Sequence, residues 1–236
     1  MRWHRFGMAP SVVWLVWRLL AEAQSSDPWL VVPGKSVGAI TATTTRAELV
    51  GYFGASNVSD RMAGPGGDAE AVPATVVNGQ QAESRLVIFW DKLDATGNHP
   101  EATAHPDFLR LCYGNEAPGM HCKWHLANGL SLGTSRRELE ALNGRSFDLS
   151  GFGWDYSGTV TDWKGGKLAG QLRACGLVGV ALAPKPASPG SPEERLPMAV
   201  SGDKTFSSSD PAMQQVNPVI YPITVKFPAS GNCPAI

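Results

Sequence analysis

Aromatic residues and carboxylates are concentrated in one short stretch of this sequence, FGWDYSGTVTDW. If the stretch is extended, Trp154 and Tyr156 lie on one face and Asp155 on the other, because side chains alternate along a strand. Exposed aromatic rings stack on sugar rings or anchor a protein partner. The alternative is that one or both rings cover a helix of the fold. Trp154, Asp155, Tyr156 and Trp163 are therefore the candidate binding residues.

The same stretch offers two carboxylates, Asp155 and Asp162. They could serve as the acid and base of a glycosidase, in which two carboxyl groups flank the bond that is cleaved. Separate carboxylates on a solvated surface are the more common arrangement, so we assign no catalytic residue. A carbohydrate-active or other hydrolytic enzyme that uses Asp155 and Asp162 is the alternative to a non-catalytic binding protein.

A second motif is the string GLSLG, a Gly-x-Ser-x-Gly pattern that is typical of the nucleophile in α/β hydrolases. In that fold the catalytic His follows the Ser, whereas the last His of this chain, His125, precedes Ser131. We interpret the two glycines as backbone at the entrance of a helix. Ser131 is then a turn residue and not a nucleophile.

The four cysteines predict two disulfides. Cys112 and Cys122 close a short loop that contains Gly, Asn and Pro, and Cys175 and Cys233 would tie the C-terminal tail to the body. Four cysteines allow three pairings, and loop geometry favours this one. Two nearby histidines could supply zinc ligands together with the thiolates, but oxidation is the stronger expectation in an exported protein. We assign no metal ligand and expect no cofactor.

The N-terminus predicts a signal peptide over residues 1–23. Basic residues precede an apolar run, Phe6–Trp17, and a small-x-small cleavage site follows at Ala21–Ala23. The run is too short to span a bilayer comfortably, and Arg18 near its end leaves an amphipathic helix of a cytosolic protein as the alternative. We expect a secreted or periplasmic protein without a stable transmembrane segment after cleavage. The net charge of −1, without a basic cluster, argues against nucleic acid as a partner.

One segment occurs twice, offset by 90 residues. TTRAELVGYFG at Thr44–Gly54 aligns without a gap with TSRRELEALNG at Thr134–Gly144, and five positions are identical. Each copy begins with a Thr-x-x-Glu or Ser-x-x-Glu capping box, in which a hydroxyl and a carboxylate satisfy N–H groups of the first helical turn. Each ends at a Gly suited to a left-handed cap. Each copy therefore predicts a helix of about nine residues, which is too short to be stable alone.

The remaining pattern favours antiparallel strands. The predicted strands are Ala74–Val77 paired with Arg85–Trp90, a hairpin over Phe152–Trp163 with a bend at Ser157-Gly158, a strand over Lys167–Leu182, and an edge strand over Val219–Phe227 that contains Pro222. Two segments predict irregular structure, the Gly- and Ala-rich Arg61–Val72 and the Pro- and Ser-rich Pro184–Pro211.

We therefore predict an α+β fold of two related units, each a short capped helix packed on antiparallel strands. Charged residues make up only 17% of the chain, and its 26 Gly and 18 Pro favour a loop-rich, partly β structure. The predicted divisions are a signal peptide (1–23), a first unit (24–126), a second unit (127–183), a Pro/Ser-rich extension (184–218) and a C-terminal edge strand and tail (219–236).

This unit resembles the β-lactamase inhibitor protein family and the related BamE/SmpA outer-membrane lipoprotein unit. The resemblance rests on Gly38–Gly54, Gly129–Gly144 and the aromatic pairs at Phe89-Trp90 and Trp154-Asp155-Tyr156, and it covers about half the chain. It implies a tandem-repeat α+β fold that works by binding a protein or an envelope component. The chain departs from these families in its Pro-rich extension and in having no lipid-attachment Cys. Inhibition of β-lactamase does not follow, because one fold hosts many functions.

Overall fold

The computed structural model describes residues 27–65, 69–114, 120–173 and 178–228. The predicted signal peptide lies outside these residues, as do Cys175 and Cys233. The described residues form a mixed α+β fold that is mostly sheet, which confirms the predicted class. Their helices are α1 (Arg46–Phe53), α2 (Arg136–Asn143), α3 (Lys167–Arg173) and α4 (Pro211–Val216), with 3-10 segments η1 (Ala55–Asn57), η2 (Ala82–Ser84) and η3 (Pro192–Val200).

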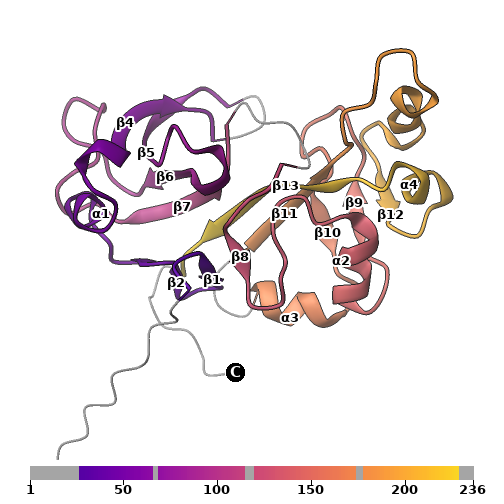
Figure 1. Cartoon of the computed structure of the whole chain (residues 1–236), viewed down its shortest axis with the longest axis horizontal. Coiled ribbons are helices and arrows are strands. Elements are labelled where there is room, and N and C mark those ends of the chain that lie inside the picture. The colour runs from indigo at the N-terminus through magenta and orange to yellow at the C-terminus, as the bar shows by residue number, and fades with distance from the viewer. Residues whose placement is uncertain (1–26, 66–68, 115–119, 174–177, 229–236) are drawn as a thin grey trace, which may run out of the picture.

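The largest sheet has six antiparallel strands and connects the two halves of the molecule (Figure 1). Figure 1 shows β4 to β7 in one half, and β13 running from them across the middle toward α4 and β12. A late segment of the chain is thereby built into the same sheet as the early ones. The order of its strands is β11 (Val178–Ala183), β13 (Val219–Lys226), β7 (Pro106–Leu111), β6 (Leu86–Trp90), β5 (Val72–Val77) and β4 (Val58–Ala63).

Strands β5 and β6 form because both are continuous runs rich in β-branched and aromatic residues. They pair as predicted, with Val77 opposite Leu86. Both faces of this part of the sheet are buried. One face contributes Leu86 and Ile88 to the main core, and the other contributes Val87 and Phe89 to a smaller cluster.

Two smaller sheets complete the described residues. One contains β3 (Ile40–Thr41), β2 (Ser36–Val37), β1 (Leu30–Val32) and β8 (His125–Leu126), with β1 and β8 parallel. The other contains β10 (Val160–Asp162), β9 (Asp148–Ser150) and β12 (Thr205–Ser207). Together with α2 and α4, the second of these sheets forms the half of the molecule that carries the predicted binding residues (Figure 1).

Both predicted capping boxes are present. The Thr45 hydroxyl accepts a hydrogen bond from the backbone N–H of Glu48, whose carboxylate accepts one from the Thr45 N–H at 2.7 Å. Ser135 and Glu138 make the same exchange at α2. Gly144 adopts the predicted left-handed cap. Gly54 has positive φ but an extended ψ of 145°, because the chain enters η1 directly.

Helix α3 corrects the prediction of one long strand over Lys167–Leu182. The first half of that segment is helical, and only the second half is a strand, β11. Leu168 and Leu172 are four residues apart and both fully buried, which is the helical period. The Asn143 side chain accepts the Leu168 N–H and joins α3 to the end of α2. The apolar content of this segment alone did not distinguish the helical period of α3 from the alternating period of β11.

Strand β13 is not the predicted edge strand. It lies between β11 and β7, although it contains Pro222. The pairing with β11 shifts register at this point, between Val180 and Leu182, and the pairing with β7 begins only at Ile223. An internal strand tolerates the missing N–H because Pro222 lies at an irregularity in the ladder.

The two segments predicted to be irregular contain regular elements. Of the segment Arg61–Val72, the first three residues belong to β4 and Val72 begins β5, because the two strands pair along their whole length. The Pro/Ser-rich extension contains β12 and α4, and β12 pairs with β9. Asp210 caps α4 by accepting the N–H groups of Ala212 and Met213, so short local signals were present within a segment whose composition suggested a loop.

Candidate functional site

The aromatic stretch forms the turn between the antiparallel strands β9 and β10, so a hairpin is present, but its first strand precedes Phe152 and is not part of the predicted Phe152–Trp163. We call residues 152–159 the aromatic turn. The Ser157 N–H donates to the Trp154 carbonyl at 3.0 Å, and the Thr159 N–H donates to the Tyr156 carbonyl at 2.9 Å. Gly153 and Gly158 have positive φ, which bends the chain where a strand would continue straight.

Three other segments hold the aromatic turn in place. Phe152 is buried, and its backbone exchanges hydrogen bonds with the Val200 carbonyl and the Gly202 N–H. At the other end, the Gly158 carbonyl accepts the Leu182 N–H at 2.9 Å. A Cβ at Gly158 would lie 1.8 Å from the Leu182 carbonyl oxygen, so only Gly fits there. The aromatic turn is therefore a rigid feature of the surface.

The aromatic turn presents two of the three predicted aromatic residues to solvent. Trp154 is 64% exposed and Tyr156 is 80% exposed. Neither ring stacks on another ring or on a cation within the described residues. Tyr156 also has a φ of 59°, a conformation that costs a non-Gly residue roughly 1 kcal/mol or more. A strained residue whose ring is mostly exposed and unstacked indicates a role outside the fold.

Trp163 is separated from the other predicted residues. It is only 5% exposed, its ring centroid lies 5.4 Å from that of Phe147, and its carbonyl accepts a hydrogen bond from Asn143. Trp163 is therefore a core residue. The sequence pattern did not distinguish it from Trp154, because both rings occupy similar positions beside an Asp.

The two carboxylates are not joined in a cleft. Asp155 is exposed in the aromatic turn, and Asp162 is exposed on β10, where it accepts the Lys164 N–H at 2.8 Å. A cavity of about 390 Å³ lies elsewhere, between the segment after β11 and α4, and neither carboxylate lines it. Its lining residues are Pro184, Lys185, Pro186, Ala187, Ser188, Ser191, Pro197, Gln215 and Val216.

The other motifs of the sequence have structural roles. The Ser131 hydroxyl donates to the Trp124 carbonyl at 2.7 Å, so its hydrogen is engaged in the fold and Ser131 is a turn residue, as predicted. Cys112 and Cys122 form the predicted disulfide, with their Cα atoms 6.0 Å apart. His125 contacts the Asp27 carboxylate and the Lys123 carbonyl. No group of three or more His, Cys, Asp or Glu side chains in the described ranges is placed to hold a metal ion.

A polar cluster around Asp60 was not anticipated from the sequence. The Arg46 Nε donates to both carboxylate oxygens of Asp60 at 2.8 and 2.9 Å, and the buried Thr75 hydroxyl donates to one at 2.8 Å. Thr75 in turn accepts the Trp90 indole N–H, and His99 lies 3.5 Å from the carboxylate. Because Thr75 is fully buried, its hydroxyl cannot reach a substrate, and the cluster links β4, β5 and β6 to α1.

This cluster predicts a specific pH dependence. Burial raises the pKa of Asp60. The hydrogen bonds from Arg46 and Thr75, together with the Arg46 charge and His99, outweigh burial, so the pKa of Asp60 lies below its ordinary value. A lowered pKa gives stability that is present above about pH 4 and is lost as the pH falls through the folded pKa. Asp60→Asn is expected to destabilise by about 2 kcal/mol at pH 7, and this difference from the wild type should shrink in urea melts at pH 3.

A matched control is Asp155→Asn, which changes an exposed carboxylate that forms no hydrogen bond or ion pair with described residues. Its difference from the wild type should stay near zero at both pH values. If Asp60→Asn costs the same free energy at pH 3 as at pH 7, ionisation of Asp60 in the native state is not what stabilises the cluster.

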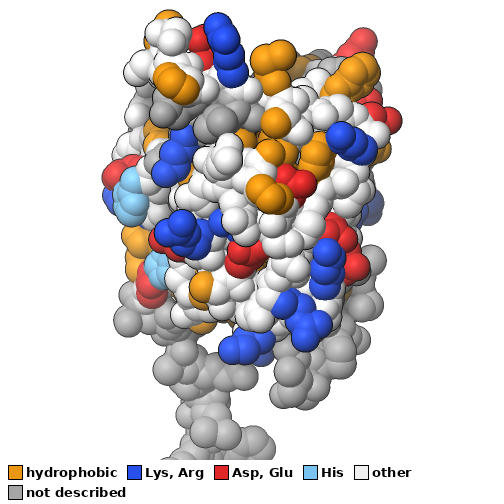
Figure 2. Space-filling view, turned by 90° about the vertical axis from the view of Figure 1, so that its right-hand side faces the viewer, with side chains coloured by type: hydrophobic (Ala, Val, Ile, Leu, Met, Phe, Trp, Pro, Cys, Tyr) orange, Lys and Arg blue, Asp and Glu red, His pale blue; other side chains and the backbone are white. Residues whose placement is uncertain are grey.

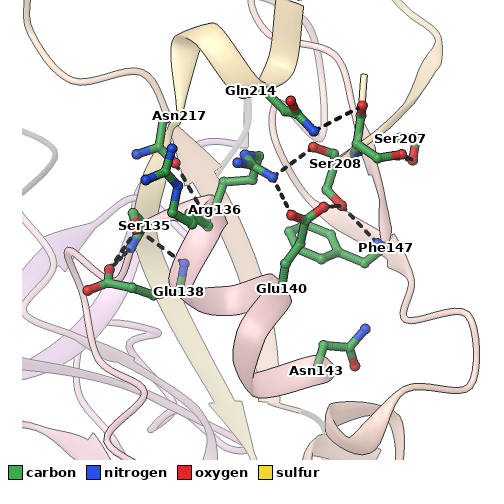
Figure 3. A network of polar contacts seen from close by, with 12 residues as sticks. Ser135, Arg136, Glu138, Glu140, Asn143, Phe147, Ser207, Ser208, Gln214 and Asn217 are labelled. Carbon is green, nitrogen blue, oxygen red and sulfur yellow. Dashed lines mark hydrogen bonds and ion pairs between the residues drawn. The ribbon is translucent and has the colours of Figure 1, made fainter. Parts of the chain in front are cut away.

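A second polar network joins α2 to the residues beside β9 and β12 (Figure 3). Arg136 on α2 donates to the Glu140 carboxylate at 2.5 Å and to the Ser208 carbonyl at 3.0 Å. The Ser208 hydroxyl donates to Glu140 and accepts the Phe147 N–H. Ser208 follows β12 and Phe147 precedes β9, so the network ties α2 to the strand pair from which the aromatic turn continues.

The end of the molecule formed by α2, α4 and β12 has a mixed surface. Figure 2 shows its hydrophobic side chains in small groups, mainly in the upper half, among Lys, Arg, Asp and Glu side chains. No helix in the described part of the chain is both long and apolar enough to cross a bilayer. The aromatic turn is therefore the most distinctive candidate site. Comparison of the chain with protein-family models, with curated proteins and with solved structures finds no match.

Proposed function

We propose that the protein is an exported, non-catalytic binding protein and that the aromatic turn contacts a protein or an envelope component. The observation that carries the proposal is Tyr156, which is 80% exposed and yet held at positive φ. A residue of this kind costs stability and gives none back through packing, and such strain is concentrated at ligand-binding positions. The neighbouring Trp154 adds a second exposed ring on the same rigid turn.

Rigidity favours a binding role. An aromatic side chain on a pre-ordered turn loses little conformational freedom when it meets a partner, so more of the contact energy appears as affinity. Buried Phe152 and the close packing of Gly158 supply that order. The disulfide between Cys112 and Cys122 fits an oxidising compartment, which supports a secreted or periplasmic location.

We further propose that α1 and α2 belong to two related units. The turn before each helix is closed by the same hydrogen bond, from Thr41 N–H to the Thr44 hydroxyl at 2.9 Å and from Ser131 N–H to the Thr134 hydroxyl at 3.1 Å. Equivalent Leu residues, Leu49 and Leu139, are fully buried. These matches support duplication, and the relation to the β-lactamase inhibitor protein family that we propose from the sequence of this segment would agree with a binding role.

The test is capture of envelope material by the immobilised mature chain, compared between the wild type and two variants. Trp154→Ala and Tyr156→Gly should each reduce the retained material at least tenfold. Tyr156→Gly should leave the free energy of unfolding unchanged or raise it by up to about 1 kcal/mol, because Gly accepts positive φ without strain. Loss of capture without loss of stability is what a binding residue, and not a structural one, produces.

Tyr52→Ala is the matched control, because Tyr52 is also an exposed aromatic residue, at 51%, but lies on α1 in the other half of the molecule. It should retain envelope material as the wild type does. If Tyr52→Ala and Trp154→Ala reduce capture equally, the retention is non-specific and the aromatic turn is not the site.

A further inference from the structure

We propose that the ligand of the aromatic turn is a neutral glycan, with sugar rings stacked on Trp154 and Tyr156 and sugar hydroxyl groups donating hydrogen bonds to Asp155. This inference rests on the proposed function, since it names the ligand of the same site. It follows from three properties of the turn, which are its free ring faces, its small apolar area and its charge.

The ring faces are free to stack. The C–H groups on one side of a pyranose ring are weakly positive, and they match the negative face of an aromatic ring. Trp154 and Tyr156 are the two most exposed aromatic residues of the described chain, and neither ring has an aromatic or cationic neighbour there. A flat sugar ring needs no enclosing pocket to make such a contact.

The apolar area is small for a protein partner. A stable protein interface buries about 800 Å² on each side, whereas two aromatic side chains supply at most about 500 Å². The other exposed residues of the turn are Gly153, Asp155 and Ser157. Asp is depleted in the cores of protein interfaces, but an exposed carboxylate that lies between two aromatic residues in sequence is a strong acceptor for sugar hydroxyl groups.

The charge of the turn selects against anionic polymers. The aromatic turn carries Asp155 and no Lys or Arg. On the strands that flank the turn, Asp162 is exposed, while Asp148 is paired with Lys164. An acidic polysaccharide or a nucleic acid would meet like charge there, whereas a neutral glycan would not.

The deciding experiment treats the envelope fraction before capture. One portion is oxidised with periodate, which destroys sugar diols, and another is digested with protease. The inference expects protease to leave capture by the wild-type chain intact, and it expects periodate to abolish capture where the glycan carries vicinal diols. Capture that survives periodate but is lost after protease would overturn the inference and leave the proposed function standing. Absence of turn-dependent capture from the untreated fraction would instead remove the proposed function itself.

Native gels containing β-glucan, soluble starch, glycol chitin or alginate then identify the sugar class. At least one of the three neutral polymers should retard the wild type, with Trp154→Ala at least tenfold weaker, Asp155→Ala severalfold weaker and Tyr52→Ala unchanged. Retardation by alginate alone, removed by salt, would overturn the neutral-glycan assignment. Equal retardation of wild type and Trp154→Ala in a neutral polymer would overturn the stacking role.

Discussion

Replacing Arg136 by Met is expected to lower the free energy of unfolding by about 3 kcal/mol. The Arg136 side chain is only 4% exposed, while that of its partner Glu140 is 23% exposed. Removing the guanidinium leaves a mostly buried carboxylate without its counter-ion, and it also leaves the Ser208 carbonyl without a donor. The partial exposure of Glu140 places the effect at the lower end of the range for broken buried pairs.

Arg137→Met is the matched control, because Arg137 is the next residue of the same helix and is exposed. Its effect in urea melts should stay within about 0.5 kcal/mol. The double variant Arg136→Met, Glu140→Leu should regain most of the loss, since a buried ion pair replaced by apolar side chains of similar size is often neutral. A single Arg136→Met variant within about 1 kcal/mol of the wild type would contradict a stabilising network.

The same network explains why part of this fold was visible in the sequence and part was not. The capping boxes at Thr45 and Ser135 were predictable because each is complete within four residues. The burial of Arg136 was not, because its partner Ser208 lies 72 residues away. Arg136 and Arg46 are equivalent in the repeated segment, yet one is buried beside Ser208 and the other pairs with Asp60. A local repeat does not determine its tertiary surroundings.

The candidate site, too, was predictable from the sequence only in part. Exposure of Trp154 and Tyr156 depends on the turn that Gly153 and Gly158 make. The sequence shows the two glycines, but it does not show that both adopt a positive φ. The burial of Trp163 depends on Phe147 and Asn143, which approach it only in the folded chain. Sequence spacing therefore located the aromatic cluster, and long-range packing decided which rings remained accessible.

The disulfide between Cys112 and Cys122 gives the second large prediction. Replacing both residues by Ala is expected to lower the free energy of unfolding by about 3 kcal/mol, the value for a cross-link that closes a loop of this size. The two residues are 10 apart in sequence and both are buried. Cys112 directly follows β7, its N–H donates to the Arg85 carbonyl, and Cys122 lies two residues before fully buried Trp124.

The cross-link therefore joins the large sheet to the segment that carries β8, and its loss should act on the unfolded chain more than on native contacts. Urea melts of the double variant should show a lower midpoint, while the capture of envelope material by the aromatic turn is unchanged because the turn shares no backbone hydrogen bond with this segment in the described residues. The single variant Cys122→Ala should cost at least as much, since Cys112 stays buried without a covalent partner. A double variant as stable as the wild type would show that native packing alone holds β7 and β8 in place.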